Sequence, residues 1–192
     1  SHPNAPWIKH VIIKHVEIFY DYPGVPGVGA GIEAKYGRNT DLLISHCYIH
    51  DTGLPFYFIN VHNSIIEYNY ICRNGSDAEH HSEAVSYRSS SSNIFRYNIW
   101  NDIEGTGYIV NLSGPTDSTE IYGNIFFVTD GNPYNKSVGN GVITTRTSGD
   151  CLASYWKIYN NTFVNLYGHV IALYVSGGGN VAFNNVFYRN LM

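Results

Sequence analysis

The stretch Ile158-Tyr159-Asn160-Asn161-Thr162-Phe163 decides the fold, because versions of it occur seven times in the 192-residue chain. In each version an apolar residue lies three positions before a central residue, and a large apolar residue lies two positions after it. The seven central positions are Val16, Cys47, Asn69, Asn98, Asn124, Asn161 and Asn185, separated by 31, 22, 29, 26, 37 and 24 residues. A repeat of about 20 to 40 residues is typical of solenoid folds.

Each repeat reads as two short strands around a tight turn. The residues three before and two after the centre point inward in this reading, and their neighbours alternate outward with the period of a strand. A central Asn tolerates the left-handed backbone conformation of a sharp bend, and its amide can bond backbone groups. Stacked Asn side chains can also bond one another. We therefore expect an Asn ladder from Asn69 to Asn185, interrupted at the N-terminal end by Val16 and Cys47.

A third apolar segment follows each pair of strands, after a loop of variable length. These segments are residues 31–36, 56–61, 82–88, 107–112, 141–146 and 169–174. Three strands per repeat predict an all-β fold, a right-handed parallel β-helix of about seven rungs in a single domain over residues 1–192. At about 4.8 Å per rung this makes a rod roughly 30 Å long. Neither end carries a polar cap, so we expect further rungs of a longer protein or other subunits to cover the ends.

Composition narrows the classes of function. Hydrophobic residues make up 44% of the chain and charged residues only 14%. Asn, Ser, Thr, Gly and 17 Tyr make up the difference, and this mix suits β structure with many turns rather than helices. A net charge of −4 gives no basic footprint for nucleic acid. No apolar run approaches the roughly 18 residues of a membrane-spanning helix. The three cysteines are too few, and odd in number, for a disulfide framework.

The loops that vary in length mark one edge of the predicted solenoid. They cover residues 21–30, 50–55, 73–81, 101–106, 129–140 and 165–168. Because the rungs stack, all six loops should emerge beside the third segments. Insertions gathered on one face of a repeat protein usually mark its binding face.

The repeated Ile-x-Asn-Asn-x-Phe phrase with its variable loop resembles the pectate-lyase-like superfamily of right-handed β-helices, over the chain from about Val11 to Tyr188. The resemblance implies an extracellular or cell-surface protein that handles a polysaccharide in a groove along one strand face. The superfamily includes lyases, hydrolases, epimerases, phage tailspikes and surface proteins without known catalysis. The activity therefore depends on the site and not on the fold.

The densest polar cluster, residues 77–83, reads Asp-Ala-Glu-His-His-Ser-Glu. A lyase acting on a uronic acid polymer must neutralise the carboxylate, remove the C5 proton and protonate the leaving oxygen. Residues of the types that do this are gathered here, and the predicted catalytic residues are His81, Glu83, Tyr87 and Arg88. Asp77 and Glu79 could hold Ca²⁺ through carboxylate oxygens.

The strand over residues 82–88 can take two phases. We expect Ala84 and Ser86 to point inward, and Glu83, Val85 and Tyr87 to point outward. The reason is that a buried, unpaired carboxylate at Glu83 would be costly.

Equivalent positions on neighbouring rungs supply the predicted substrate-binding residues, which are Lys35, Tyr48, His50, Tyr70, Asp102 and Glu104. Tyr48 and Tyr70 should lie one above the other on the outside. There they can stack on sugar rings, or they can pair with each other and stabilise the sheet.

Two alternatives to a lyase remain open. A hydrolase needs two or three carboxylates about 5 to 10 Å apart, which Glu83, Asp102 and Glu104 could supply. However, the chain lacks the Asp-Asp and Gly-His-Gly signatures of the polygalacturonases in the same superfamily. The other alternative is a non-catalytic β-helix for glycan adhesion or tailspike-like assembly. The outward Tyr122, Tyr159 and Phe183 make the last rungs apolar outside and suggest a covered, oligomeric surface.

Overall fold

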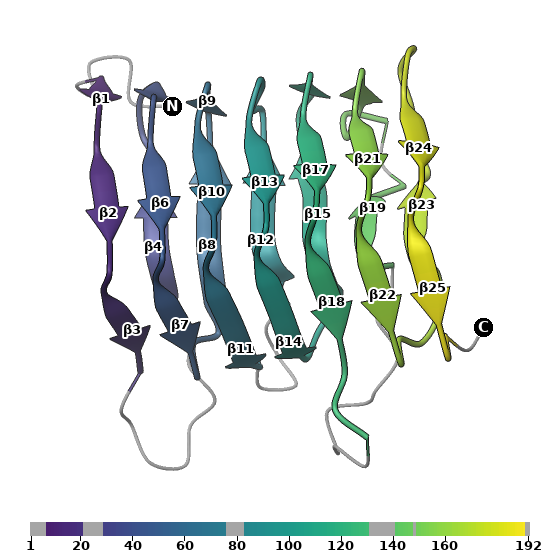
Figure 1. Ribbon diagram of the computed structural model, residues 1–192. Coiled ribbons are helices and arrows are strands. Elements are labelled where there is room, and N and C mark those ends of the chain that lie inside the picture. The colour runs from purple at the N-terminus through teal and green to yellow at the C-terminus, as the bar shows by residue number, and fades with distance from the viewer. Residues whose placement is uncertain (1–6, 21–28, 76–82, 131–140, 148, 191–192) are drawn as a thin grey trace.

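The computed structural model describes residues 7–20, 29–75, 83–130, 141–147 and 149–190. These residues form no helix, and every strand pair among them is parallel (Figure 1). Consecutive strands belong to different sheets, and each strand pairs with its equivalents in the rungs before and after. Ile66, for example, pairs with Ile44 on one side and Phe95 on the other. The prediction of an all-β, parallel, solenoid-like chain is confirmed, and the arrangement is consistent with a parallel β-helix.

Three long sheets run along the molecule, and their rungs follow one another in chain order in Figure 1. Sheet 1 contains β2 (Ile12–Lys14), β6 (Leu43–Ser45), β10 (Ile65–Glu67), β13 (Ile94–Arg96), β17 (Glu120–Tyr122), β21 (Lys157–Tyr159) and β24 (Val181–Phe183). Sheet 2 contains β3 (Glu17–Phe19), β7 (Tyr48–His50), β11 (Tyr70–Asn74), β14 (Ile99–Ile103), β18 (Ile125–Phe127), β22 (Thr162–Val164) and β25 (Val186–Tyr188).

Sheet 3 contains β4 (Ala30–Ala34), β8 (Leu54–Ile59), β12 (Glu83–Arg88), β15 (Gly107–Ser113), β19 (Ile143–Thr145) and β23 (Ile171–Leu173). Short strands lie where the chain passes from sheet 3 back to sheet 1. They are β1 (Ile8–Lys9), β5 (Asn39–Thr40) and β9 (Val61–His62), with β16 (Thr116–Asp117) and β20 (Ala153–Ser154) further along. The described rungs contain no helix with the length and apolarity needed to cross a lipid bilayer.

The core is built from the inward rows of the repeat. In the middle rungs the residues three before and two after the centre are buried, as the pattern predicts. Their rings stack from rung to rung: Trp100 lies 6.0 Å from Phe126, and Phe126 lies 5.0 Å from Phe163. Burying an aliphatic or aromatic side chain of this kind stabilises the fold by about 1.5–3 kcal/mol. The rows thus hold successive rungs together.

The turn between sheets 1 and 2 differs from the prediction in one respect. The left-handed backbone conformation falls on the residue before the central one, as at His46 (φ 56°), Tyr68 (φ 53°) and Tyr97 (φ 56°), and not on the central Asn. The central Asn bonds its neighbours instead. The Asn98 Nδ2 donates to Asn124 Oδ1 at 3.1 Å, and the Asn98 backbone N–H donates to the same oxygen at 3.0 Å. Equivalent side-chain bonds join Asn69 to Asn98, Asn124 to Asn161 and Asn161 to Asn185.

The residues before the central position form their own column on the outside of this turn. The rings of His46 and Tyr68, and of Tyr68 and Tyr97, lie 5.1 Å apart. The next residue in the column is Gly123, and a Cβ added there would lie 2.6 Å from the ring of Tyr97. Gly123 is therefore required by the close approach of Tyr97, in addition to its φ of 66°.

The predicted strand phase over β12 is wrong. Val85 and Tyr87 pair with Phe56 and Phe58, and all four are fully buried in the core. The reverse phase is stable because both inward polar side chains have partners. The Glu83 carboxylate, whose burial was expected to be costly, accepts a hydrogen bond from Thr106 Oγ1. The Tyr87 hydroxyl lies 3.0 Å from Thr119 Oγ1 and accepts a hydrogen bond from Asn93 Nδ2 at 2.5 Å.

Candidate functional site

Five of the predicted site residues lie on the outer faces of two sheets, Lys35 and Arg88 on sheet 3 and Tyr48, His50 and Tyr70 on sheet 2. The proposed Ca²⁺ ligands Asp77 and Glu79 and the predicted catalytic residue His81 lie outside the described residues. Among the residues that are described, no cluster of three or more His, Cys, Asp or Glu side chains could hold a metal ion.

Two of the predicted catalytic residues are enclosed by the fold. Tyr87 is fully buried, and burial raises the pKa of its hydroxyl to about 12. It therefore cannot reach a polymer outside the helix or act as a base near neutral pH, which corrects its predicted role. Glu83 is also buried, and its Oε1 accepts a hydrogen bond from Thr106 Oγ1 at 2.5 Å. This bond compensates in part for removing the carboxylate from water.

The outer face of sheet 3 brings together Lys35 and Arg88 around Tyr57. Lys35 follows the end of β4 directly, Tyr57 lies in β8, and Arg88 ends β12. The Lys35 Nζ and the Arg88 Cζ each lie 5.3 Å from the centroid of the Tyr57 ring. Cations at this distance are attracted to the ring face. The Tyr57 ring thus contacts two positive charges, one from the rung before it and one from the rung after it.

These two cations differ in how they are paired. Lys35 forms an ion pair with Glu33, and the hydrogen bond to that carboxylate raises the pKa of the ammonium group. Arg88 makes a long contact of 3.4 Å from its Nε to Ser86 Oγ. In the described part of the chain, no carboxylate lies within ion-pair distance of Arg88. The Arg88 guanidinium can therefore receive an anionic ligand.

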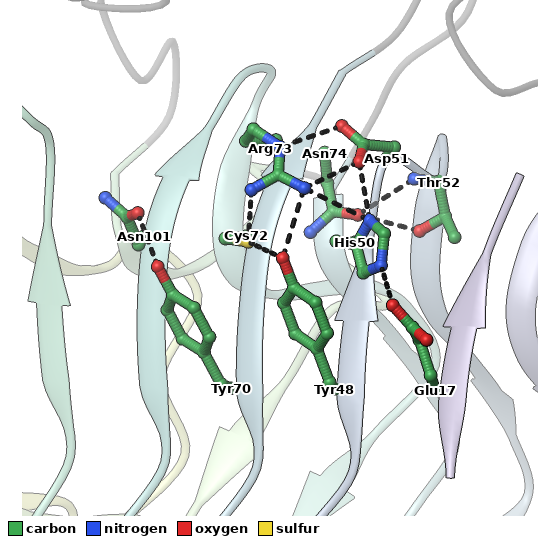
Figure 2. Close-up of polar contacts among 10 residues, drawn as sticks. All are labelled: Glu17, Tyr48, His50, Asp51, Thr52, Tyr70, Cys72, Arg73, Asn74 and Asn101. Atoms are coloured by element: carbon green, nitrogen blue, oxygen red, sulfur yellow. Dashed lines mark hydrogen bonds and ion pairs between the residues drawn. The ribbon is translucent and has the colours of Figure 1, made fainter.

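The outer face of sheet 2 carries a denser polar cluster, which Figure 2 shows centred on Arg73. We call it the sheet 2 network: Glu17, Tyr48, His50, Asp51, Cys72 and Arg73. Its residues come from β3, β7 and β11 and from the turn residue Asp51. It contains two of the predicted substrate-binding residues, Tyr48 and His50.

Arg73 is the centre of the sheet 2 network. Its Nε and Nη2 donate to the two oxygens of Asp51 at 3.0 and 2.7 Å, a bidentate pair. Nη2 also lies 3.2 Å from the Tyr48 hydroxyl, and Nη1 lies 3.3 Å from Cys72 Sγ (Figure 2). The hydrogen bond to Asp51 is the main cause that raises the pKa of Arg73. Few guanidinium donors remain for a ligand.

The other charges of the network are paired in the same way. The ring of His50 has Asp51 Oδ2 2.5 Å from its Nδ1 and Glu17 Oε1 3.0 Å from its Nε2. Burial acts to raise the pKa of the Asp51 carboxyl, but the hydrogen bonds from Arg73 and His50 outweigh it and the pKa is lowered. Burial raises the pKa of the Cys72 thiol, so it is not an activated nucleophile. The charged side chains of the sheet 2 network thus bind one another.

The aromatic residues of sheet 2 cover each other. The rings of Tyr48 and Tyr70 are stacked, with centroids 5.5 Å apart and an interplanar angle of 8°. One face of each ring is thus turned toward the other ring. The Tyr70 hydroxyl donates to Asn101 Oδ1 at 3.1 Å. This arrangement favours the reading in which the tyrosines stabilise the sheet.

Asp102 and Glu104 lie near the end of β14 and do not join either group. Asp102 is buried, and its two oxygens accept hydrogen bonds from the backbone N–H and the hydroxyl of Thr129 at 2.7 and 2.9 Å. Glu104 is half-buried. With Asp102 bonded to Thr129 and Glu83 bonded to Thr106, two of the three carboxylates considered for a hydrolase are already occupied.

Sequence reasoning missed Tyr57 and the pairing of Asp51 with Arg73. Tyr57 could have been found, because it lies between Phe56 and Phe58 and period-2 alternation then turns it outward. The pairing of Asp51 with Arg73 joins residues 22 positions apart and follows only from the stacking of rungs.

Comparisons of the chain with protein-family models, with curated proteins and with solved structures gave no match.

Proposed function

We propose that this chain is an extracellular or cell-surface right-handed parallel β-helix of about seven rungs, with an Asn ladder at one turn, that binds an acidic polysaccharide. The ligand lies on the outer face of sheet 3. The observation that carries the proposal is the contact of both Lys35 and Arg88 with the ring of Tyr57. The resemblance to the pectate-lyase-like superfamily supports the same ligand class.

Uronic acid polymers match what this face offers. Their carboxylates suit guanidinium groups, which bind them through two parallel hydrogen bonds, and ammonium groups, which bind as point charges. The half-buried Tyr57 ring between the cations gives an apolar surface for the C–H face of a sugar. The sheet 2 network has more charged groups, but its Arg73 already binds Asp51. Arg88 has no carboxylate partner among the described residues, and this difference favours sheet 3 as the binding face.

Cleavage by β-elimination is the second candidate, and the outward Arg88 favours it. A guanidinium bound to the substrate carboxylate would acidify the C5 proton, which a base then removes. The C4–C5 double bond forms as the C4–O bond breaks, and the leaving oxygen takes a proton from water. Tyr87 and Glu83 do not reach this face, so the base in this candidate is His81. If no turnover occurs, the same face serves the non-catalytic alternative, a glycan-adhesion or tailspike-like β-helix.

The binding proposal is tested with Arg88→Ala and a matched control, Lys14→Ala, which removes an exposed cation from sheet 1. Pectate, alginate and hyaluronan are titrated against each variant, with neutral dextran as the reference polymer. Loss of a hydrogen bond to a charged group costs about 1.5–3 kcal/mol, so Arg88→Ala should weaken binding roughly 10- to 100-fold. Lys14→Ala should change it less than about twofold. Equal losses in the two variants, or equal binding of dextran, would contradict the proposal.

The lyase candidate is tested with the same polymers by the ultraviolet absorbance of the unsaturated product, with and without Ca²⁺. Arg88→Ala and His81→Ala should each abolish the signal. A chain that binds acidic polymers and gives no such product is the non-catalytic β-helix. Turnover that survives both substitutions would place the chemistry elsewhere.

A further inference from the structure

One row of side chains runs along the exposed end of sheet 3. Inward residues of successive strands pair in register: Ala34 with Phe58, Phe58 with Tyr87, Tyr87 with Asn111, Asn111 with Thr145, and Thr145 with Leu173. The residues that directly follow these in the chain together form one outward row. In order, that row is Lys35, Ile59, Arg88, Leu112, Arg146 and Tyr174. A cation therefore occurs on every second rung.

The spacing of these cations follows from the sheet. Neighbouring strands lie about 4.8 Å apart, so cations on alternate strands are separated by roughly 10 Å along the helix axis. The positions of Lys35 and Arg88 are consistent with this spacing. The Lys35 Nζ and the Arg88 Cζ each lie 5.3 Å from the Tyr57 centroid, so the two atoms are separated by no more than twice that distance. Arg146 lies two strands beyond Arg88, is exposed, and donates its backbone N–H to Asn111 O.

The rungs between the cations are neutral at this row. Ile59 and Leu112 are half-buried and apolar. The irregular register after Tyr87 sets Arg88 opposite Ser113, which is also neutral. Two positions earlier on the later strands, Ser86, Val110 and Thr144 are buried, so beyond Tyr57 a ligand reaches this row and not that one.

Within the described ranges, Lys35 is the one cation of this row with a counter-ion. Glu33 pairs with Lys35. In the described ranges no other carboxylate comes within ion-pair distance of Arg88 or Arg146. Positive charge at roughly 10 Å intervals, with apolar or neutral groups between, is thus presented to the outside.

We propose that the ligand of this face is a polysaccharide in which a uronic acid alternates with a neutral sugar. This inference rests on the proposed function and specifies its ligand class. An extended pyranose chain lying along the axis advances by about one strand spacing per sugar. Alternate acids then meet Lys35, Arg88 and Arg146, and the neutral sugars lie against Ile59 and Leu112. A homopolymer of uronic acid would bring carboxylates to those apolar side chains, where removing charge from water without a partner is unfavourable.

The experiment compares oligosaccharides of equal length by calorimetric titration at one fixed salt concentration. The alternating set is hyaluronan and unsulfated chondroitin, and the homopolymer set is pectate and polymannuronate. We expect the alternating set to bind at least about tenfold more tightly. Affinity should rise with length up to about five sugars, the number that spans three cations on alternate rungs.

Variants make the test independent of any single ligand. Arg146→Gln should weaken the alternating set about tenfold, whereas Lys157→Gln, a cation of sheet 1 that pairs with Glu120, should leave it unchanged. Ile59→Lys adds a cation to a neutral rung and should shift the preference several-fold toward the homopolymers. The midpoint of thermal unfolding checks that each variant is folded.

The outcomes separate the two levels of the proposal. Equal or tighter binding of the homopolymers, or no effect of Arg146→Gln and Ile59→Lys in folded variants, overturns the alternating ligand and leaves acidic-polysaccharide binding standing. Failure of every acidic polymer to bind overturns both.

Discussion

The outer faces of sheets 2 and 3 use similar residues in opposite ways. On sheet 2, Arg73 binds Asp51 through two hydrogen bonds, and Tyr48 and Tyr70 cover each other's ring faces. On sheet 3, Arg88 lies against a single ring, Tyr57, and no described carboxylate pairs with it. The denser cluster of charge is therefore the one with less capacity to bind. Whether a charged side chain already has its partner is a better guide to a binding face than how many charges are gathered.

The largest expected effect concerns the core beneath sheet 3. Tyr87→Ala should lower the free energy of unfolding by about 3–5 kcal/mol, because it removes a fully buried ring packed against Phe95 and Trp156. Urea-induced unfolding measures this. Tyr87→Phe keeps the ring and should leave any turnover of an acidic polymer intact. Loss of turnover in a folded Tyr87→Phe protein would show that the hydroxyl acts in catalysis.

A smaller effect is expected from breaking the pairing on sheet 2. Asp51→Ala should cost about 1 kcal/mol of unfolding free energy, because the Arg73–Asp51 pair is partly exposed and screened by water. Combining it with Arg73→Ala in a double-mutant cycle isolates the pair. The affinity of the sheet 3 face for polymer should not change. A second, weaker polymer-binding face created by freeing Arg73 would show that the contrast between the sheets is a matter of pairing alone.

The smallest effect is the dependence of the same pair on pH. The folded-state pKa of Asp51 is lowered from 3.8, so the carboxylate stabilises the fold above that value. The contribution is lost as the pH falls through the lowered folded-state pKa, where protonation ends the pairing with Arg73. Unfolding of the natural chain and of Asp51→Asn, measured between neutral and strongly acidic pH, should give curves that converge at low pH. A difference that persists unchanged there would exclude this origin.

The repeat phrase was enough to predict the architecture. Alternating apolar positions around Asn161 specify inward rows, and six relatives at solenoid spacing specify stacking. The same rules misjudged the phase of β12, because the partners that make an inward Tyr87 tolerable are Asn93 and Thr119, which follow it in the chain and are contributed by other segments. A strand pattern contains no information about such partners.

The site was predicted less well than the fold for a related reason. Lys35 and Arg88 were identified one by one, but their common contact with Tyr57 depends on register across three strands. The pairing that neutralises Arg73 likewise depends on which turn residue lies one rung away. The pattern within a rung can be read from the sequence, whereas the neighbour across the rungs needs the register.

The column that includes Tyr97 and Gly123 limits how this protein could be rebuilt. Any side chain larger than hydrogen at position 123 would meet the Tyr97 ring, so the size of one turn residue determines which residue the next rung can accept. Rungs of this molecule are therefore not interchangeable units. Duplicating, deleting or reordering a rung would need compensating substitutions in the rungs on both sides of it. A substitution at one turn likewise limits which substitutions the next turn can accept.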